Sequence, residues 1–341
     1  MTDSFVRYHL NLRQLVERLG PNHPRLTDAL VLQARLTENM DEATRYGPSE
    51  TNRADRMRIL EQLNNLAIAT CDVPFFQLYP INEGLTDSES ETGRASELDL
   101  IYIEAGCFIM GSILGVDPDA KNDEHPIHSV YIQDYAITRT TITNAQYALF
   151  VNDTNYRPPS HWTKGQFARG KGDHPVVNVS LVDALAYCDW MKQLFKQPFT
   201  LPSEAEWEKA ARGEHALTYP WGYDWKDFYA NTKELGRRDT IPVHELAIGQ
   251  SKYGLLHMSG NVFEWTRTIW GADDEGPEFS YPYRHNDGRE DLQAKNDIYR
   301  IVRGGAFNTS AKSARTTART RYKANTCRPD IGFRIVTYAP S

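Results

Sequence analysis

Residues 299–336 read YRIVRGGAFNTSAKSARTTARTRYKANTCRPDIGFRIV, and this stretch decides the fold. Its two ends, 300–307 and 331–336, are rich in apolar and β-branched residues and predict short strands. Gly304 and Gly305 predict a turn or a close approach of two backbones. The residues between the ends are small and polar and follow neither a helical nor a strand period. We therefore expect an irregular surface supported by two strands, which is where binding sites usually lie.

The composition is that of a folded protein. The chain has 341 residues, 11% of them aromatic, which allows two domains with a sizeable core and argues against disorder. The formal net charge of −7 argues against a protein that binds nucleic acid over its whole surface. No apolar run approaches the ~18 residues of a membrane span, and the first residues, MTDSFVRYHLNL, lack the pattern of a signal peptide. We therefore expect a cytoplasmic protein.

Cysteine and histidine spacings favour structural roles over metal binding. The four cysteines lie far apart and form no CxxC pair, which predicts isolated thiols rather than a disulfide framework or a metal site. His125 and His128 could suggest a transition metal, but no cysteine or carboxylate stands at a ligand spacing. We interpret both histidines as structural. The cysteines are Cys71, Cys107, Cys188 and Cys327.

Residues 1–80 carry a helical pattern. Apolar residues recur at helical spacing within 5–19, 26–40 and 53–69, and Gly20-Pro21 ends the first of these runs. The sequence of residues 56–79, RMRILEQLNNLAIATCDVPFFQLY, resembles the small helical effector-associated or adaptor domains of bacterial signalling and defence proteins. That resemblance implies that these helices couple the protein to a partner. A helical cap packed on the main domain is the alternative.

Residues 81–97 are rich in Ser, Thr, Glu and Gly and predict a linker. A second domain, 98–341, then begins with strand-like runs at 98–112 and 128–138. Three helices follow, and mainly loops come after them. The helices are predicted at 144–153 with Asn or Thr as N-cap, at 181–195 with Ser180 as N-cap, and at 199–213 with a Ser203/Glu206 capping box and Gly213 as the C′ residue.

Ten short motifs of the second domain, in their order, resemble the formylglycine-generating enzyme, or sulfatase-modifying factor, family. Together they span residues 98–337, and the resemblance implies an α+β domain of the C-type-lectin-like fold with much irregular loop. The motifs are FIMGS at 108–112, Glu124 and Pro126 with His128 and Val130, ITNAQY at 142–147, residues 174–190, LPSEAEWEKAARG at 201–213, YPWG at 219–222, Ala230-Asn231, GLLHMSGNVFEW at 254–265, RGGAF at 303–307, and GFR at 332–334.

The resemblance implies a copper(I) site made of two cysteines, and this sequence departs from it. Thr309 and Ala314 stand where those cysteines would be, Ala306 stands where the enzyme has a serine, and Cys327 comes too late. The family's sulfoxide-forming branch binds iron through histidines, yet the N-terminal region has no HxxxH spacing. We therefore expect a non-catalytic member that requires no cofactor. An oxidase or oxygenase with a relocated metal site is the alternative.

The resemblance also implies structural calcium, which is bound by hard oxygen ligands. The matching residues are Asn231 with Thr232 for one site, and Gly260, Val262 and Glu264 for the other. Both matches are incomplete. The alternative is that Glu264 and Asn261 bind loop backbone without an ion.

Charge occurs in blocks near the C-terminus. Residues 300–334 hold nine Lys or Arg against one acid, whereas residues 264–297 hold nine acids against four bases. The basic block could bind an anion or nucleic acid, or the two blocks could neutralise each other. We favour neutralisation, with arginines bound to loop carbonyls. Arg303, Arg315 and Arg334 are then internal, and Lys312, Arg321 and Lys323 are surface candidates.

Residues 308–330 also resemble the variable region of lectin-fold proteins that retroelements diversify, which lies between an RGG-type and a GFR-type frame. The resemblance implies a ligand- or protein-binding surface, with Lys312 and Lys323 as fixed positions. We expect Asn308, Thr309, Ser310, Ser313, Thr320, Tyr322 and Asn325 to form one exposed, mostly flat face, which Trp270, Phe279, Tyr281 and Tyr283 border. The predicted contact residues are Asn308, Thr309, Ser310, Lys312, Ser313, Thr316, Thr320, Tyr322, Lys323, Asn325, Thr326, Arg328, Asp330 and Trp270.

Overall fold

A computed structural model describes residues 12–13, 15–20, 23–46, 50–71, 98–113 and 117–338 of the chain. The predicted linker, 81–97, and the start of the first predicted helix lie outside the described residues. No helix of the described residues is both long and apolar enough to cross a membrane.

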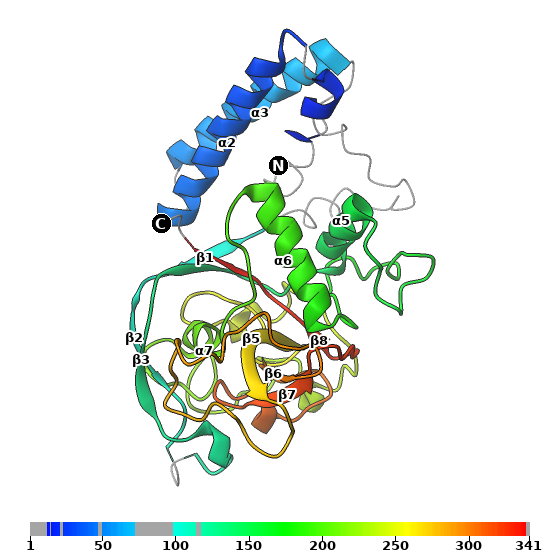
Figure 1. Ribbon diagram of the computed structural model, residues 1–341. Coiled ribbons are helices and arrows are strands. Elements are labelled where there is room, and N and C mark those ends of the chain that lie inside the picture. The colour runs from blue at the N-terminus through cyan, green and yellow to red at the C-terminus, as the bar shows by residue number, and fades with distance from the viewer. Residues whose placement is uncertain are drawn as a thin grey trace.

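The N-terminal region is helical, as predicted. Helices α2 (Leu26–Tyr46) and α3 (Glu50–Cys71) pack side by side in a hairpin that projects from the rest of the molecule (Figure 1). Leu36, Leu60 and Leu63 are buried in the hairpin, which places the predicted apolar faces inward. Helix α2 contacts strand β1 (Leu100–Ile103). Arg13, which precedes the hairpin, forms an ion pair with Asp153 of the second domain. The hairpin thus rests against that domain.

Three capped helices follow the first strands. Helix α5 (Asn144–Thr154) begins at Thr143, α6 (Leu181–Phe195) at Ser180, and α7 (Glu204–Arg212) at Ser203. Each N-cap side chain accepts a hydrogen bond from the backbone N–H three residues on, and each N3 side chain binds the cap in return. The predictions of Ser180, Ser203 and Glu206 as capping residues are confirmed. Gly213, with φ of 65°, ends α7 as predicted.

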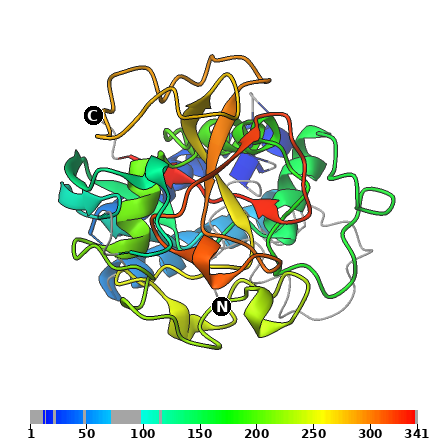
Figure 2. The same cartoon turned by 90° about the horizontal axis from the view of Figure 1, so that it is seen from below.

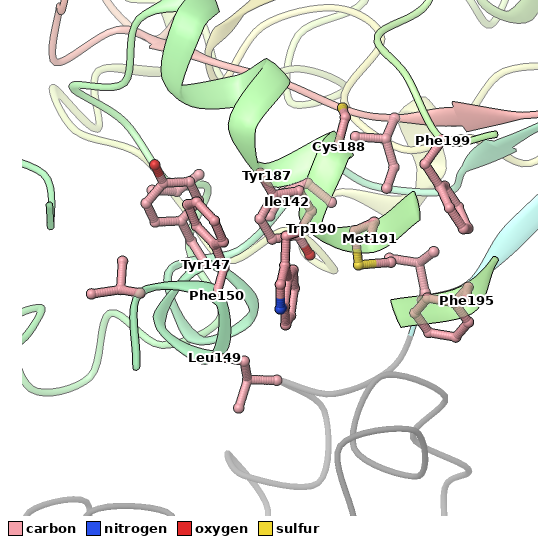
Figure 3. Close-up of a cluster of buried hydrophobic side chains, with 14 of the residues drawn as sticks. Ile142, Tyr147, Leu149, Phe150, Tyr187, Cys188, Trp190, Met191, Phe195 and Phe199 are labelled. Atoms are coloured by element: carbon pink, nitrogen blue, oxygen red, sulfur yellow. The ribbon is translucent and has the colours of Figure 1, made fainter. Parts of the chain in front are cut away.

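Helices α5 and α6 form one side of an aromatic core. Figure 3 shows Tyr147 and Phe150 of α5 facing Tyr187 and Trp190 of α6. The Tyr147 and Tyr187 rings are stacked with centroids 5.8 Å apart, and the Phe150 and Trp190 centroids are 5.7 Å apart. Phe333 packs edge-on against the Tyr187 ring, so the end of the chain belongs to the same core.

The strands form three small antiparallel or mixed sheets. One has the order β1-β4-β9, with β4 at Tyr135–Thr138 and β9 at Val336–Thr337. A second pairs β2 (Gly106–Met110) with β3 (His128–Ile132). The third has the order β7-β6-β5-β8, with β7 at Thr320–Lys323, β6 at Tyr299–Arg303, β5 at Phe263–Gly271 and β8 at Ile331–Gly332. The α+β fold class is confirmed.

Two strands of the third sheet were not predicted. The region after α7 was expected to be mainly loop, yet β5 is a nine-residue strand at the centre of the sheet. Its residues are almost all buried, yet Glu264, Thr266, Arg267 and Thr268 are polar or charged, so the strand shows neither a continuous apolar run nor an alternation that continues beyond Thr266. The β-branched and aromatic residues of β5 favour a strand, and they could have revealed it in the sequence. Strand β7 lies within the stretch expected to be irregular, and it pairs with β6.

Candidate binding surface

The segment after β6 lies at the end of the molecule opposite the helical hairpin (Figures 1 and 2). It begins at Gly304 and Gly305, whose φ angles are 95° and 72°. A Cβ on Gly305 would lie 3.0 Å from the Ala314 Cα, and one on Gly304 would lie 3.2 Å from the Trp207 ring. The predicted close approach at this glycine pair is therefore confirmed. This close approach folds the segment after β6 back onto itself.

The structure divides the predicted contact residues into three groups by exposure. Four side chains are exposed, seven are half-buried and three are buried. The exposed residues are Asn308, Lys312, Lys323 and Asn325; the half-buried residues are Thr309, Ser310, Ser313, Thr320, Tyr322, Thr326 and Arg328.

The three buried residues cannot line a surface, so their prediction is wrong. Thr316 is 0% exposed, and its hydroxyl donates to the Leu217 carbonyl, 2.6 Å away. Asp330 is 1% exposed and accepts hydrogen bonds from Arg328 and Asn308. Trp270 is 2% exposed and lies beneath two guanidinium groups. Each of these side chains therefore packs inside the protein, beneath the surface of residues 308–330.

The aromatic residues expected to border the surface are also mostly internal. Tyr281 and Tyr283 are buried, and Phe279 is half-buried. The guanidinium of Arg289 lies 4.4 Å from the Tyr283 ring centroid and 5.7 Å from that of Phe279. Cations on their faces and the surrounding chain cover these rings, so they form no exposed rim.

Buried arginines hold the segment to helix α7. Arg303 donates to Glu204 at 2.6 Å and to Glu208 at 2.7 Å, and all three side chains are fully buried. Arg319 donates to both carboxylate oxygens of Glu204, at 2.8 and 3.0 Å. Charge-assisted, forked contacts of this kind are the strongest hydrogen bonds in proteins. They set the position of the turn that follows β6.

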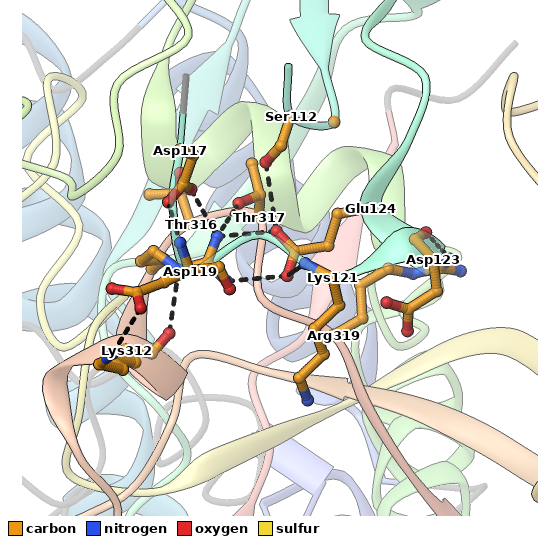
Figure 4. A network of polar contacts seen from close by, with 12 residues as sticks. Ser112, Asp117, Asp119, Lys121, Asp123, Glu124, Lys312, Thr316, Thr317 and Arg319 are labelled. Carbon is orange, nitrogen blue, oxygen red and sulfur yellow. Dashed lines mark hydrogen bonds and ion pairs between the residues drawn. The ribbon is translucent and has the colours of Figure 1, made fainter. Parts of the chain in front are cut away.

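A second buried ion pair joins the segment to residues 117–124. Arg315 donates to both oxygens of Glu124, at 2.7 and 2.8 Å, and to Asp117 at 2.7 Å. Figure 4 shows Asp117, Asp119 and Glu124 gathered against Thr316 and Thr317. Arg315 was predicted to be internal, and this prediction is confirmed, as it is for Arg303 and Arg334.

The basic block, residues 300–334, is thus neutralised, but mostly by acids outside the acidic block at 264–297. The partners of Arg303, Arg315 and Arg319 come from α7 and from residues 117–124. For the ion pairs of the basic block, residues 300–334, the acidic block at 264–297 supplies two acids among the described residues: Glu264, which pairs with Arg334, and Asp274, which pairs with Arg321. Arg321 is half-buried rather than fully on the surface.

These ion pairs shift the pKa values of the buried carboxylates. Burial raises the pKa of Glu124, but the hydrogen bonds and charge of Arg315 outweigh burial, and the net pKa lies below its ordinary value of 4.5. Burial likewise raises the pKa of Glu204, and Arg319 and Arg303 more than offset it. A carboxylate whose pKa is lower in the folded state than in the unfolded state stabilises the folded protein at pH values above its ordinary pKa. This stabilisation is lost as the pH falls toward the lowered pKa.

We therefore expect the free energy of unfolding to fall as pH decreases below about 4.5. Urea unfolding of Glu124→Gln, compared with the parent chain at pH 7 and pH 4, measures the part that this ion pair contributes. The loss between the two pH values should be smaller in Glu124→Gln. Glu245→Gln, at an exposed glutamate, is the control and should keep the parent's acid sensitivity. Equal acid sensitivity in all three proteins would contradict the assignment.

The carboxylate of Glu264 does not fit a calcium site. Both of its oxygens accept from Arg334, at 2.6 and 2.7 Å, and one also accepts from the Trp207 indole N–H at 2.7 Å. All of these groups are buried. An arginine that binds a carboxylate through both oxygens leaves no free charge for a metal ion. Glu264 is therefore an ion-pair residue rather than a ligand.

The other predicted calcium residues lie in a tight backbone crossing. Asn231 packs against Gly260, where a Cβ would lie 2.6 Å from the Asn231 carbonyl oxygen. Asn261 accepts from the Ile241 N–H and donates to the Ile241 carbonyl, so it binds loop backbone as the alternative interpretation expected. The side-chain oxygens of Asn231 and Thr232 are buried without a hydrogen-bond partner. Val262 is buried beside them.

The residues present do not fit the family's copper site. The Thr309 hydroxyl is bound to the Ala306 backbone at 2.9 and 3.0 Å, and Ala314 is buried against Gly305. Neither position carries a thiol. Cys107, Cys188 and Cys327 are free cysteines, as predicted, and the side chain of Cys71 lies outside the described residues. Across the described part of the chain, no three His, Cys, Asp or Glu side chains are grouped closely enough to hold a metal ion.

The two histidines occupy different environments. His128 uses both ring nitrogens, with Nδ1 2.8 Å from the Pro126 carbonyl and Nε2 2.8 Å from the Tyr283 N–H. Its structural role is therefore supported. His125 places Nδ1 2.8 Å from the Ser112 carbonyl, while its Nε2 has no hydrogen-bond partner. His125 lines a pocket of about 410 Å³ beside Trp270, Tyr281 and Arg321.

Comparison with known families matches residues 86–339 to the sulfatase-modifying factor enzyme 1-like domain. The chain belongs to this family. The sulfatase-modifying factor relatives include the formylglycine-generating enzyme of Thermomonospora curvata, 29% identical over 294 residues, which cover 69% of this chain and 92% of that protein. The inactive C-alpha-formylglycine-generating enzyme 2 of Mus musculus is 25% identical over 305 residues, with 73% and 89% covered. The family thus contains both active and inactive members.

Solved structures show the fold of the sulfatase-modifying factor domain in this chain, which is C-type-lectin-like. PvdO from Pseudomonas aeruginosa superposes with a TM-score of 0.57 and 23% identity, and the match covers 70% of this chain and 93% of that one. Treponema denticola variable protein 1 superposes with a TM-score of 0.54 and 22% identity, covering 70% and 94%. At these identities the likeness concerns the fold alone.

Proposed function

We propose that this chain is a non-catalytic member of its family that binds a protein or small-molecule ligand through residues 308–330. One observation carries the proposal: the two positions of the family's copper cysteines hold a backbone-bound Thr309 and a buried Ala314. A scaffold that keeps its fold without those thiols can still display side chains. Inactive C-alpha-formylglycine-generating enzyme 2 and Treponema denticola variable protein 1 support this function as similar proteins.

The contact surface in this proposal consists of Asn308, Lys312, Lys323 and Asn325, with the half-buried Tyr322 among them. The Arg328 guanidinium lies 4.9 Å from the Tyr322 ring centroid, which holds that aromatic side chain in place. A rigid aromatic group among short polar side chains is typical of adaptable binding surfaces. We further propose that retroelement diversification shapes this surface, that the N-terminal helices couple it to a partner, and that the protein is cytoplasmic. Structural calcium at Asn231 and Thr232 also stays a proposal.

Restoring the cysteines tests the absence of copper chemistry. The parent chain and Thr309→Cys/Ala314→Cys would be loaded with copper(I), dialysed and analysed for copper by mass spectrometry. We expect no stoichiometric copper in the parent chain and about one ion per chain in the double variant, because soft thiolates bind copper(I). A parent chain that retains one redox metal per chain would instead favour the alternative, an oxidase or oxygenase with a relocated metal site.

A phage-displayed random peptide library, selected on the full chain, tests the surface. Selected peptides should bind Asn308→Ala/Lys312→Ala/Lys323→Ala/Asn325→Ala at least about ten-fold more weakly, since few residues carry most binding energy. Lys226→Ala/Glu245→Ala, at exposed positions elsewhere, is the matched control and should bind them unchanged. If the peptides bind the quadruple variant as they bind the parent, the surface is not the binding face. Affinity that falls steeply with salt would favour an anion-binding surface.

A further inference from the structure

One face of the molecule carries arginines whose carboxylate partners lie beneath them. Arg328 donates to the two oxygens of Asp330, at 2.8 and 2.9 Å, and these side chains are 39% and 2% exposed. Arg157, which lies outside residues 308–330, donates to Asp183 at 2.8 and 3.2 Å, and these side chains are 70% and 7% exposed. Each pair therefore buries its negative charge and presents its positive charge to solvent.

The two ion pairs adjoin each other. The exposed Cys327 precedes Arg328 in the chain, and its thiol donates to Asp183 at 3.9 Å. The Arg328 carbonyl accepts from the Asn178 N–H at 2.8 Å, just before helix α6, which contains Asp183 in its first turn. Arg157 and Arg328 thus belong to one surface around Cys327, although they are far apart in the sequence.

Both guanidinium groups are held in place and keep a donor free. Each binds its aspartate through Nε and Nη2, and Nη1 has no hydrogen-bond partner among the described residues. Arg328 Nη1 is not buried, and the Arg157 side chain is largely exposed, so a ligand in solvent can reach both groups.

The contacts of Arg328 fix its guanidinium before any ligand binds. Its guanidinium lies 4.9 Å from the Tyr322 ring centroid. Burial raises the pKa of Asp330, but hydrogen bonds from Arg328 and Asn308 more than offset burial, and the net pKa lies below its ordinary value of 3.8. The carboxylate is therefore ionised at neutral pH and holds the arginine. A donor that is already ordered loses little entropy on binding.

Lys323 adds a third cation to this face. Its side chain is exposed, its ammonium lies 5.6 Å from the Tyr299 ring centroid, and it forms no ion pair with any described residue. The adjoining loop brings Lys295 and Asp297, both exposed, whose charges offset each other. Positive charge therefore dominates the exposed groups of this face.

An acidic segment of a protein matches this arrangement. Guanidinium groups bind carboxylates through directed, charge-assisted hydrogen bonds. The half-buried Tyr322 ring offers rigid area beside the cations for an apolar or aromatic side chain. Nucleic acid matches less well, because the net charge of −7 repels a long polyanion.

We propose that the partner bound through residues 308–330 is an acidic protein segment whose carboxylates bind Arg157, Arg328 and Lys323. This inference rests on the function proposed above and names the chemistry of its partner. It also extends the contact surface to Arg157.

Fluorescence anisotropy with a labelled ten-residue peptide of alternating glutamate and tyrosine is the first test. The same peptide with glutamine in place of glutamate is the control, because it keeps the size and the aromatic rings but lacks the charges. We expect the full chain to bind the glutamate peptide at least about ten-fold more tightly than the glutamine peptide. Equal affinities for the two peptides would overturn the proposal, as would tighter binding of a single-stranded DNA of similar length.

Variants then locate the peptide. Lys323→Gln should weaken the glutamate peptide about three-fold, and Arg157→Gln/Arg328→Gln at least about ten-fold, because each loses donors to carboxylates. Arg58→Gln is the matched control, at an exposed arginine of helix α3 that pairs with Asp55, and should bind like the parent. Lys323 has no ion-pair partner, so Lys323→Gln leaves no carboxylate unpaired. Parent-like binding by Lys323→Gln and by the double variant would overturn the proposal.

Phage selection on the full chain separates this inference from the function on which it rests. Peptides that lose binding in the quadruple alanine variant should be enriched in Asp and Glu over the unselected library. If they show no such enrichment, the partner is not acidic, and the proposed function stands without this inference. If the glutamate peptide depends on Arg157 and Arg328 but binds the quadruple variant like the parent, the acidic site stands and the proposed contact surface is overturned.

Discussion

Replacing Arg303 by methionine is expected to lower the free energy of unfolding by about 3–5 kcal/mol. The substitution leaves the carboxylates of Glu204 and Glu208 buried with one guanidinium partner fewer, and it removes a donor to the Thr316 carbonyl. Arg319 and Arg212 still pair with the two carboxylates, so the protein retains part of the network. Urea unfolding followed by circular dichroism measures the loss.

Two further variants give this prediction its controls. Lys312→Ala removes a cation whose side chain is 71% exposed, and such surface pairs contribute only about 0–1 kcal/mol. Arg303→Met/Glu208→Gln removes one buried charge of each sign and should be more stable than Arg303→Met alone. Similar losses for Arg303→Met and Lys312→Ala would mean that the buried network does not anchor the segment.

Gly260→Ala is expected to lower the free energy of unfolding by about 2–5 kcal/mol. Gly260 has a φ of +80°, which costs an alanine about 1–2 kcal/mol. Its new Cβ would also lie 2.6 Å from the Asn231 carbonyl oxygen and 2.9 Å from the carbonyl carbon. Both are backbone atoms of a buried crossing, so they cannot rotate away, and overpacking adds about 1–3 kcal/mol.

Gly236 offers a matched control for that substitution. Its φ is +75°, yet a Cβ there would have no atom within 4 Å. Gly236→Ala should therefore cost only the backbone term of about 1–2 kcal/mol. The difference between the two variants in urea unfolding isolates the effect of the crossing at Asn231. If the two losses are equal, the crossing is looser than described.

Local patterns made the helices and the turn predictable. The caps at Ser180 and Ser203 bind groups only three residues away, so spacing alone reveals them. Gly304 and Gly305 were recognised because adjacent glycines favour backbone that other residues avoid. The family motifs, read in order, predicted the C-type-lectin-like fold, and Thr309 and Ala314 were visible as replacements for cysteine.

Strand β5 was missed because its buried polar and charged residues break up any strand period, and β7 was missed because a strand of four residues resembles a loop. The partners of the basic residues were also beyond local reasoning, since Arg303 and Glu204 are 99 positions apart. The same holds for the burial of Thr316, Asp330 and Trp270, and for the pocket.

By itself the sequence determined the helices with their caps, the glycine turn, the family and the missing thiols, because short-range spacing or residue identity carries each of them. Only the tertiary structure decided which side chains of residues 308–330 reach solvent and which acids neutralise the arginines. Those outcomes depend on how distant segments pack, since packing sets the burial of a side chain and burial sets the cost of leaving a charge or a hydrogen-bonding group unpaired.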